Sequence, residues 1–256
     1  MNTHIIIPAR LASSRFPEKI LANINGKTLM QHTYEQAVKS NLGPVIIAVD
    51  NLKVKEVAEA FGAQTCMTDL SHISGTSRLS EVCEQLKLPP EDFVLNWQVD
   101  EPVLNIKNAE QVVNLLKSNS SCEVATLCEE IKHFEELKNT NITKVVLNHF
   151  GQALYFSRAM IPWDRSWVCA NGRIQDSPLH LKNHFRHLGL YAYKVNFLLS
   201  YKNMPECVLE KLEGLEQLRF LYAGYKIAVE LAKENSMAGV DTPDDLQRLI
   251  TYLSNR

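Results

Sequence analysis

Long apolar runs and blocks of like charge are absent from this chain of 256 residues. No apolar stretch is long enough to cross a bilayer, and the first residues do not join a basic segment to a long apolar one, so we expect neither a membrane span nor a secretory leader. The chain has 27 Lys and Arg against 29 Asp and Glu, and no Lys/Arg block exceeds two residues. This balance disfavours nucleic acid or an anionic membrane as a partner. We therefore expect a cytoplasmic protein in which any anion binding is confined to a local cluster of basic residues.

Paired cysteines and glycine-based nucleotide motifs are also missing. The six cysteines form no C-x-x-C pair, and a chain of this length needs no disulfide, so we predict that all six are reduced. Without G-x-G-x-x-G or G-x-S-x-G, neither a dinucleotide cofactor nor a serine hydrolase has support. Gly26, Lys27 and Thr28 look like the end of a P-loop, but Leu21 stands where that motif needs its first glycine. We interpret them as a turn and a helix start.

Short apolar runs alternate with helical patterns through the first half of the chain. This alternation predicts an α/β fold with βαβ units and a mostly parallel sheet. The expected strands are 4–8, 44–49, 64–67, 92–98 and 123–128, and the expected helices are 28–40, 52–61, 77–88 and 106–117.

The second half predicts an antiparallel extension of that sheet. Its expected strands are 144–148, 153–157 and 188–193, with a turn at 149–151 and an irregular excursion over 162–184. Four leucines at helical spacing predict one helix from Leu209 to Leu218. A last helix is expected after Asp241, because Thr242 and Asp245 form a capping box.

Three cations follow the first expected strand. In doubly wound sheets, ligands bind at the carboxyl ends of the strands, so Arg10, Arg15 and Lys19 would converge there on a site the size of a triphosphate. The alternative is a solvated basic loop, since most surface charges have no such role.

Two acids are candidate ligands for Mg²⁺. Asp100 follows the strand expected at 92–98, and Asp241 precedes the last helix. Magnesium bound to nucleotide phosphates usually takes one or two carboxylates. Each acid taken alone is also compatible with an ordinary turn residue.

Three histidines at helical spacing, His180, His184 and His187, raise the alternative of a zinc site. No Cys or acid at ligand spacing supports it, and Lys182 and Arg186 would favour an anion such as a carboxylate instead.

Eight short motifs, in order along nearly the whole chain, resemble the 3-deoxy-manno-octulosonate cytidylyltransferase (CMP-Kdo synthetase) family. They are found at 6–10, 14–17, 96–102, 155–158, 161–163, 185–189, 215–219 and 240–243. The resemblance implies a homodimeric enzyme with a Rossmann-like nucleotidyltransferase fold that converts CTP and Kdo to CMP-Kdo and pyrophosphate with Mg²⁺. It implies one domain over 1–256, with a nucleotide-binding part (about 1–130 and 240–256) and a part for sugar binding and dimerisation (about 131–239).

The resemblance also assigns candidate site residues. Phosphate binding and catalysis would fall to Arg10, Arg15, Lys19 and Asp100, and the metal to Asp100 and Asp241. The nucleotide would contact Pro8, Ala9, Arg10, Ser74, Gly75 and Arg78. The sugar acid would contact Gln98, Arg158, His187, Tyr191, Glu216 and Gln217.

Three departures from the family pattern lie beside this site. Glu18 replaces a glycine, Ser77 replaces an acid, and Val99 replaces another glycine. We expect Glu18 to weaken CTP binding by charge repulsion, unless it pairs with Arg15 or turns outward, and Val99 to reshape the sugar site. Three functions therefore remain open: an active cytidylyltransferase for Kdo or a close variant, a nucleotidyltransferase for another base or sugar, and a nucleotide-binding paralog without turnover.

Overall fold

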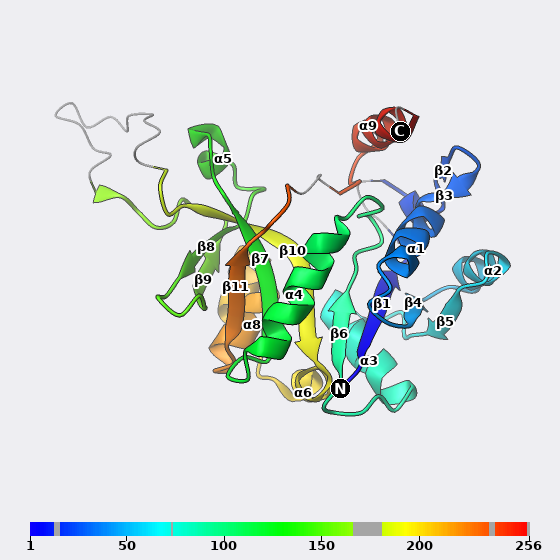
Figure 1. Ribbon diagram of the computed structural model, residues 1–256, viewed down its shortest axis with the longest axis horizontal. Coiled ribbons are helices and arrows are strands. Elements are labelled where there is room, and N and C mark those ends of the chain that lie inside the picture. The colour runs from blue at the N-terminus through cyan, green and yellow to red at the C-terminus, as the bar shows by residue number, and fades with distance from the viewer. Residues whose placement is uncertain (13–15, 73, 166–180, 236–238, 255–256) are drawn as a thin grey trace.

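A computed structural model describes residues 1–12, 16–72, 74–165, 181–235 and 239–254. Its centre is a nine-stranded sheet in the order β11-β7-β10-β6-β1-β4-β5, with β8 paired to β10 and β9 paired to β8 (Figure 1). The strands are β1 Thr3–Ala9, β4 Val45–Val49, β5 Gln64–Met67, β6 Phe93–Asn96, β7 Val124–Glu130, β8 Lys144–Leu147, β9 Ala153–Ser157, β10 Phe185–Lys194 and β11 Ile227–Leu231. A separate hairpin joins β2 Asn23–Ile24 to β3 Lys27–Thr28.

Both predicted parts of the sheet are present. β6, β1, β4 and β5 run parallel to one another. β10 lies antiparallel between β6 and β7, and β8 and β9 extend this part with two further antiparallel pairings. The prediction of a mostly parallel sheet with an antiparallel extension is therefore confirmed.

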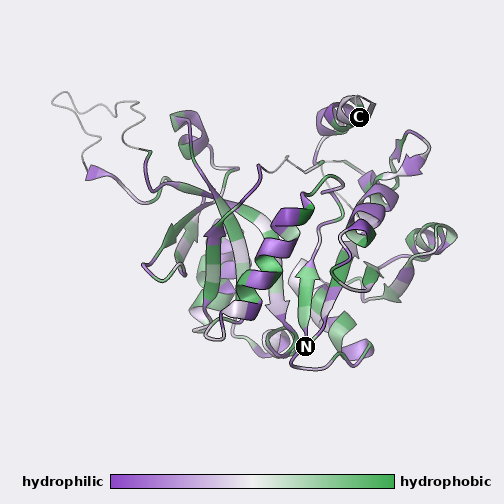
Figure 2. Ribbon diagram, viewed as in Figure 1, coloured by the Kyte–Doolittle hydropathy of each residue, from purple (hydrophilic) through white to green (hydrophobic). Residues whose placement is uncertain are grey.

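Helices cover both faces of the sheet because successive strand residues point to opposite sides. The helices are α1 Leu29–Lys39, α2 Leu52–Ala60, α3 Gly75–Gln85, α4 Ile106–Ser118, α5 Phe134–Lys138, α6 Val195–Ser200, α7 Val208–Glu213, α8 Gln217–Tyr222 and α9 Pro243–Ser254, with short 3-10 turns η1 Lys19–Leu21 and η4 Tyr201–Asn203. Ile5 and Ile7 of β1 pack in a core with α1, α2 and α4, whereas Ile6 packs on the other face with α3, α6 and α8. In Figure 2 the central strands are mostly hydrophobic, and α4 alternates between hydrophobic and hydrophilic stripes.

The single helix expected from Leu209 to Leu218 is wrong. α7 ends at Glu213, Gly214 adopts the left-handed φ of 64°, and α8 starts only at Gln217. Glycine favours this conformation because it has no Cβ, and it commonly ends helices. The break places Glu216 and Gln217 at the start of a new helix.

Local predictions from turn and cap residues are confirmed. Gly26 has φ 86°, and the Thr28 side chain caps α1 by accepting from the backbone N–H of Gln31. At α9, Asp245 accepts from the Thr242 N–H at 2.8 Å and donates its own N–H to the Thr242 hydroxyl at 3.2 Å. These contacts satisfy backbone groups that a helix start otherwise leaves unpaired.

The five cysteines within the described residues are free and buried, and Cys169 lies outside those residues. In the part of the chain that the structure describes, no helix combines the length and apolar character that crossing a membrane requires.

Candidate functional site

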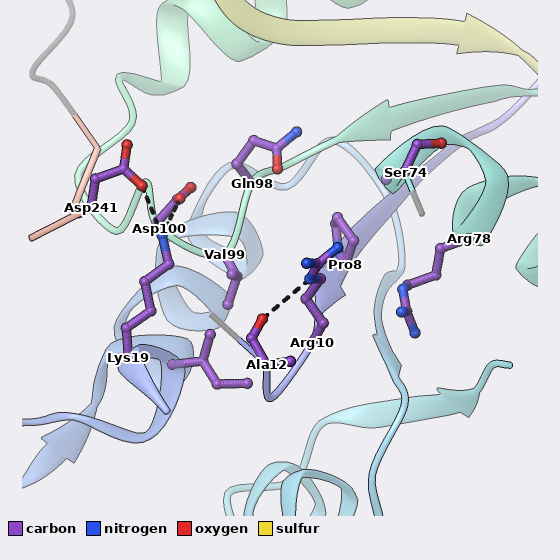
Figure 3. A pocket seen from close by; sticks show the side chains of 12 residues that line it. Pro8, Arg10, Ala12, Lys19, Ser74, Arg78, Gln98, Val99, Asp100 and Asp241 are labelled. Carbon is purple, nitrogen blue, oxygen red and sulfur yellow. Dashed lines mark hydrogen bonds and ion pairs between the residues drawn. The ribbon is translucent and has the colours of Figure 1, made fainter. Parts of the chain in front are cut away.

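A cavity of about 310 Å³ opens where the neighbouring strands β1 and β6 end (Figure 3). β1 itself contributes Pro8, and the chain leaving it contributes Arg10. The chain leaving β6 contributes Gln98 and Asp100. The full lining is Pro8, Arg10, Ala12, Lys19, Ile20, Ser74, Gly75, Arg78, Gln98, Val99, Asp100 and Asp241. The carboxyl edge of the sheet thus gathers residues of both signs in one hollow, as expected for a doubly wound sheet.

Asp100 and Asp241 meet at one ammonium group. The Lys19 Nζ lies 2.7 Å from Oδ2 of Asp100 and 3.1 Å from Oδ1 of Asp241, and it also donates to the backbone oxygen of Val240 at 3.0 Å. Burial lowers the pKa of Lys19, but the two carboxylates outweigh it, and the net shift is upward. Two acids that are distant in sequence therefore converge on one cation position.

A backbone contact explains why these acids come together. The Val240 N–H donates to the Asp100 carbonyl at 2.8 Å, which ties the segment before α9 to the segment after β6. Gly239 fits closely there, because a Cβ at that position would lie 3.2 Å from the Asp100 carbonyl oxygen.

The N-terminus of α3 forms the opposite wall. Ser74 caps the helix by accepting from the Ser77 N–H, and Gly75 is its first residue. The Ser77 hydroxyl donates to the Ser74 carbonyl at 2.9 Å, so the serine that replaces a family acid bonds within the first turn. The helix dipole favours an anion at such an end, and the Glu216 carboxyl already interacts there with the Thr76 N–H and the Ser74 hydroxyl.

Arg78 lines the cavity but its guanidinium is engaged elsewhere. It is buried, lies 3.1 Å from the Asp50 carboxylate and also donates to the Thr68 hydroxyl. Burial lowers the pKa of Arg78, while Asp50 acts in the opposite direction. Asp50 also accepts from the Leu11 N–H at 3.2 Å, which links Arg78 to the cationic loop.

The sequence analysis did not select Asp50 as a candidate site residue. Asp50 nevertheless follows the expected strand 44–49 in the way that Asp100 follows the expected strand 92–98. The signal was therefore available, since acids directly after parallel strands collect at one sheet edge.

The structure places two of the other candidate residues at or directly after the end of β1. Arg10 is exposed and its Nε donates to the Ala12 carbonyl at 3.2 Å. The Ala9 side chain is buried in the core, and Ala9 does not line the cavity. Arg15 lies outside the described residues.

Glu18 turns outward. Its carboxylate accepts from Lys53 at 2.9 and 3.1 Å, and it lines a second hollow that shares Arg10 and Ala12 with the first but does not include Lys19. The Lys53 ammonium offsets the charge of Glu18, so the expected repulsion of phosphate is reduced. Glu18 has the left-handed φ of 52°, a conformation that suits the family's glycine better than an L-residue.

Val99 is largely buried, and it both lines the cavity and packs in the core beside α1. Its carbonyl accepts from the Thr33 hydroxyl at 2.7 Å. The branched side chain therefore occupies wall space at the point where Gln98 enters the cavity.

The candidate sugar residues are only partly brought together. Gln98 lines the cavity, whereas Tyr191 and Gln217 are buried and do not line it. Burial raises the pKa of Glu216. Hydrogen bonds from the Thr76 and Ser74 hydroxyls lower this pKa, but the net shift is upward. Ser74 also lies 3.2 Å from the hydroxyl of Tyr201, a residue that sequence reasoning missed.

His187 and Arg158 lie further away. His187 borders a neighbouring cavity of about 470 Å³ that shares Asp241 with the first, and burial lowers the pKa of His187 to about 3. Its Nε2 lies 3.0 Å from the Thr126 hydroxyl. Arg158 lines neither cavity, because its guanidinium donates to backbone carbonyls at 2.7 and 3.0 Å.

The two histidines that the structure describes, His184 and His187, do not support the zinc alternative. His184 donates to the Pro162 carbonyl and His187 contacts Thr126, so they have separate partners. His180 lies outside the described residues.

Comparison with known proteins identifies the fold and its relatives. The family model described as cytidylyltransferase matches residues 4–227. A 3-deoxy-manno-octulosonate cytidylyltransferase of Francisella tularensis subsp. novicida is 46% identical over 248 residues, 97% of each chain. The chain belongs to the 3-deoxy-manno-octulosonate cytidylyltransferase family. Another member of this family, from Pseudoalteromonas atlantica, is 43% identical over 98% of this chain and 97% of its own.

A solved structure agrees with this assignment of family. The CMP:2-keto-3-deoxy-manno-octonic acid synthetase complexed with CTP is 35% identical, covers 100% of this chain and 99% of its own, and has a TM-score of 0.88. A cytidylyltransferase from Leptospira borgpetersenii, at 16% identity and a TM-score of 0.64, shares the fold alone. The predicted nucleotidyltransferase fold and family are confirmed.

Proposed function

We propose that this cytidylyltransferase transfers CMP from CTP to the anomeric hydroxyl of 3-deoxy-D-manno-octulosonate (Kdo) or a close variant, releasing pyrophosphate for lipopolysaccharide biosynthesis. The main supporting observation is the cavity in which Arg10 and the α3 N-terminus lie near two converging carboxylates. The named activity of relatives that match nearly the whole chain supports the choice of base and sugar.

The carboxylates suit a magnesium ion. Three oxygen atoms, from Asp100, Asp241 and the Val240 carbonyl, surround one cation position, and Mg²⁺ prefers oxygen ligands with few carboxylates. Asp100 and Asp241 would hold the ion. When bound, it would neutralise phosphate charge and make the attacking hydroxyl more acidic.

The protein's own groups would position the reactants. Arg10 and the positive end of the α3 dipole offer positive potential to phosphate oxygens, and Val99 and Ile20 form an apolar part of the wall. Gln98 lies in the same cavity and can bond to a sugar hydroxyl or carboxylate.

In the transfer, the sugar oxygen forms a bond to the α-phosphorus while the bond from that phosphorus to the bridging oxygen breaks. Pyrophosphate leaves with the electron pair of that bond, and the hydroxyl proton passes to solvent or to a nearby base. Positioning and charge neutralisation supply most of the rate enhancement in such reactions.

Pyrophosphate release from each of the four nucleoside triphosphates, with and without Kdo and Mg²⁺, tests the proposal. Release only with CTP, Kdo and the metal together supports it. Release with another base or sugar would favour the second function, and nucleotide binding without release would identify a paralog lacking turnover.

We also propose a cytoplasmic homodimer, as the family resemblance implies. Sedimentation of the purified chain over a range of concentrations tests the dimer. A monomer at micromolar concentration would argue against it.

A further inference from the structure

The Lys19 ammonium occupies the position where two carboxylates and a carbonyl converge. Its three acceptors come from the segments after β6 and before α9, far from η1 in sequence. Figure 3 shows the two carboxylates, those of Asp100 and Asp241, directed at the ammonium. The side chain is only 11% exposed, whereas those of Asp100 and Asp241 are 25% and 44% exposed. Lys19 therefore closes this oxygen cluster, and the acids remain open to the cavity.

All hydrogen-bonding capacity of this ammonium is used. A lysine has three N–H donors, and here each has an oxygen within 3.1 Å. Lys19 cannot donate to a phosphate without releasing at least one of these oxygens. A divalent ion on Asp100 and Asp241 would likewise compete with the ammonium, because two cations within contact distance repel.

We propose that Lys19 acts as an exchangeable placeholder, so that a divalent ion binds the two acids only after Lys19 leaves them for an incoming triphosphate. This inference rests on the proposed function. The flexible four-carbon stem of lysine permits such a change without movement of the sheet. Nearby Arg10 and the α3 N-terminus would attract the same phosphates and so favour the exchange.

The coupling has a consequence for the nucleotide-free protein. An ammonium that competes with the metal lowers metal affinity when no triphosphate is present, and a triphosphate that binds the ammonium restores it. By linkage, metal and triphosphate strengthen each other's binding by the same factor.

Mn²⁺ binding to the nucleotide-free protein, measured by electron paramagnetic resonance, tests the placeholder. Lys19→Met removes the charge but keeps much of the side-chain volume, and we expect Mn²⁺ to bind it about tenfold or more tightly than the wild type, within the usual range of coupling. Lys27→Met is the matched control, because Lys27 pairs with Glu35 and lines no part of the cavity. Its Mn²⁺ affinity should equal that of the wild type.

A second variant and a second measurement guard against misfolding. Lys19→Gln should also bind Mn²⁺ more tightly, and Mn²⁺ should raise the melting temperature of both Lys19 variants more than that of the wild type. Adding Asp100→Asn to Lys19→Met should remove the gain. Affinities of the folded Lys19 variants that stay within twofold of the wild type would overturn the placeholder.

The outcomes separate this inference from the proposed function. If the wild type releases pyrophosphate from CTP and Kdo but Lys19→Met gains no Mn²⁺ affinity, only the placeholder fails. If Lys19→Met gains affinity but the wild type never releases pyrophosphate, the placeholder stands and the proposed function fails.

Discussion

Lys144 is a buried charge whose removal should strongly destabilise the fold. Its side chain is fully buried at the start of β8, and its Nζ donates to three backbone carbonyls, those of Asn139, Ile142 and Arg158, at 3.0, 2.6 and 2.6 Å. Burial lowers the pKa of Lys144, and Arg158 adds to this effect. The contacts join the loop before β8 to the chain leaving β9.

The magnitude follows from the three hydrogen bonds that are lost. Lys144→Met keeps the volume but removes one donor from each of three carbonyls, of which that of Asn139 keeps the Ile142 N–H at 3.1 Å. Each hydrogen bond to a charged group contributes roughly 1.5–3 kcal/mol. Relief of the buried charge offsets part of that sum. Removing one partner from a buried charged network typically costs about 3–5 kcal/mol, which for a chain of this size corresponds to a fall in melting temperature of roughly 6–20 °C.

Urea unfolding followed by circular dichroism measures this effect. Lys138→Met is the control, since Lys138 pairs with Glu135 on the surface and should change the free energy of unfolding by less than about 1 kcal/mol. A free energy of unfolding of Lys144→Met within about 1 kcal/mol of the wild-type value would refute the reasoning. The buried carbonyls would then find other donors without penalty.

Three further changes have defined outcomes. Glu18→Gln should leave the KM for CTP within about twofold of the wild type, because the carboxylate faces Lys53 and this exposed ion pair contributes little. A severalfold lower KM would instead show that the Glu18 charge repels the bound phosphates. Asp100→Asn should lower kcat by roughly a hundredfold or more, as expected when charge-stabilising groups are lost, whereas near-normal turnover would remove Asp100 from the mechanism. Asp92→Asn should reduce stability at neutral pH. Burial acts to raise the pKa of Asp92, but bonds from the Asn2 N–H and His4 lower it overall, so its contribution is present above the unfolded value of 3.8 and is lost as pH falls through the lowered pKa. Unfolding of both proteins between pH 7 and pH 2 checks this, and a gap that persists at the acid end would contradict it.

The sheet could be predicted because its strands are buried on both faces. β1 and β4 appear in the sequence as short, nearly continuous apolar runs, as strands covered by helices on both sides do. β11 was missed, although Ile227, Ala228 and Val229 are buried, because it is short and has polar neighbours. Its pairing with β7 depends on residues about a hundred positions earlier, which local patterns do not encode.

The site was predicted in its location but not in its pairings. Position after a strand was enough to select Arg10 and Asp100, because chain direction sets the edge at which they emerge. It could not show that Lys19 bonds to Asp100 and Asp241, or that Arg78 bonds to Asp50. Such pairs depend on the relative placement of loops, and only the tertiary structure determines that.

The three departures from the family pattern bear on whether the protein turns over its substrate. Glu18 is directed to Lys53, Ser77 bonds to the Ser74 carbonyl, and Val99 fills wall space with its carbonyl bonded to Thr33. None of them adds an unpaired charge to the cavity or separates Asp100 from Asp241. A site that had lost its function would be under no constraint to keep two carboxylates and a lysine in hydrogen-bonding register across three distant segments. We therefore expect catalysis to persist, with Val99, the one departure that adds volume beside Gln98, affecting sugar selection more than nucleotide binding.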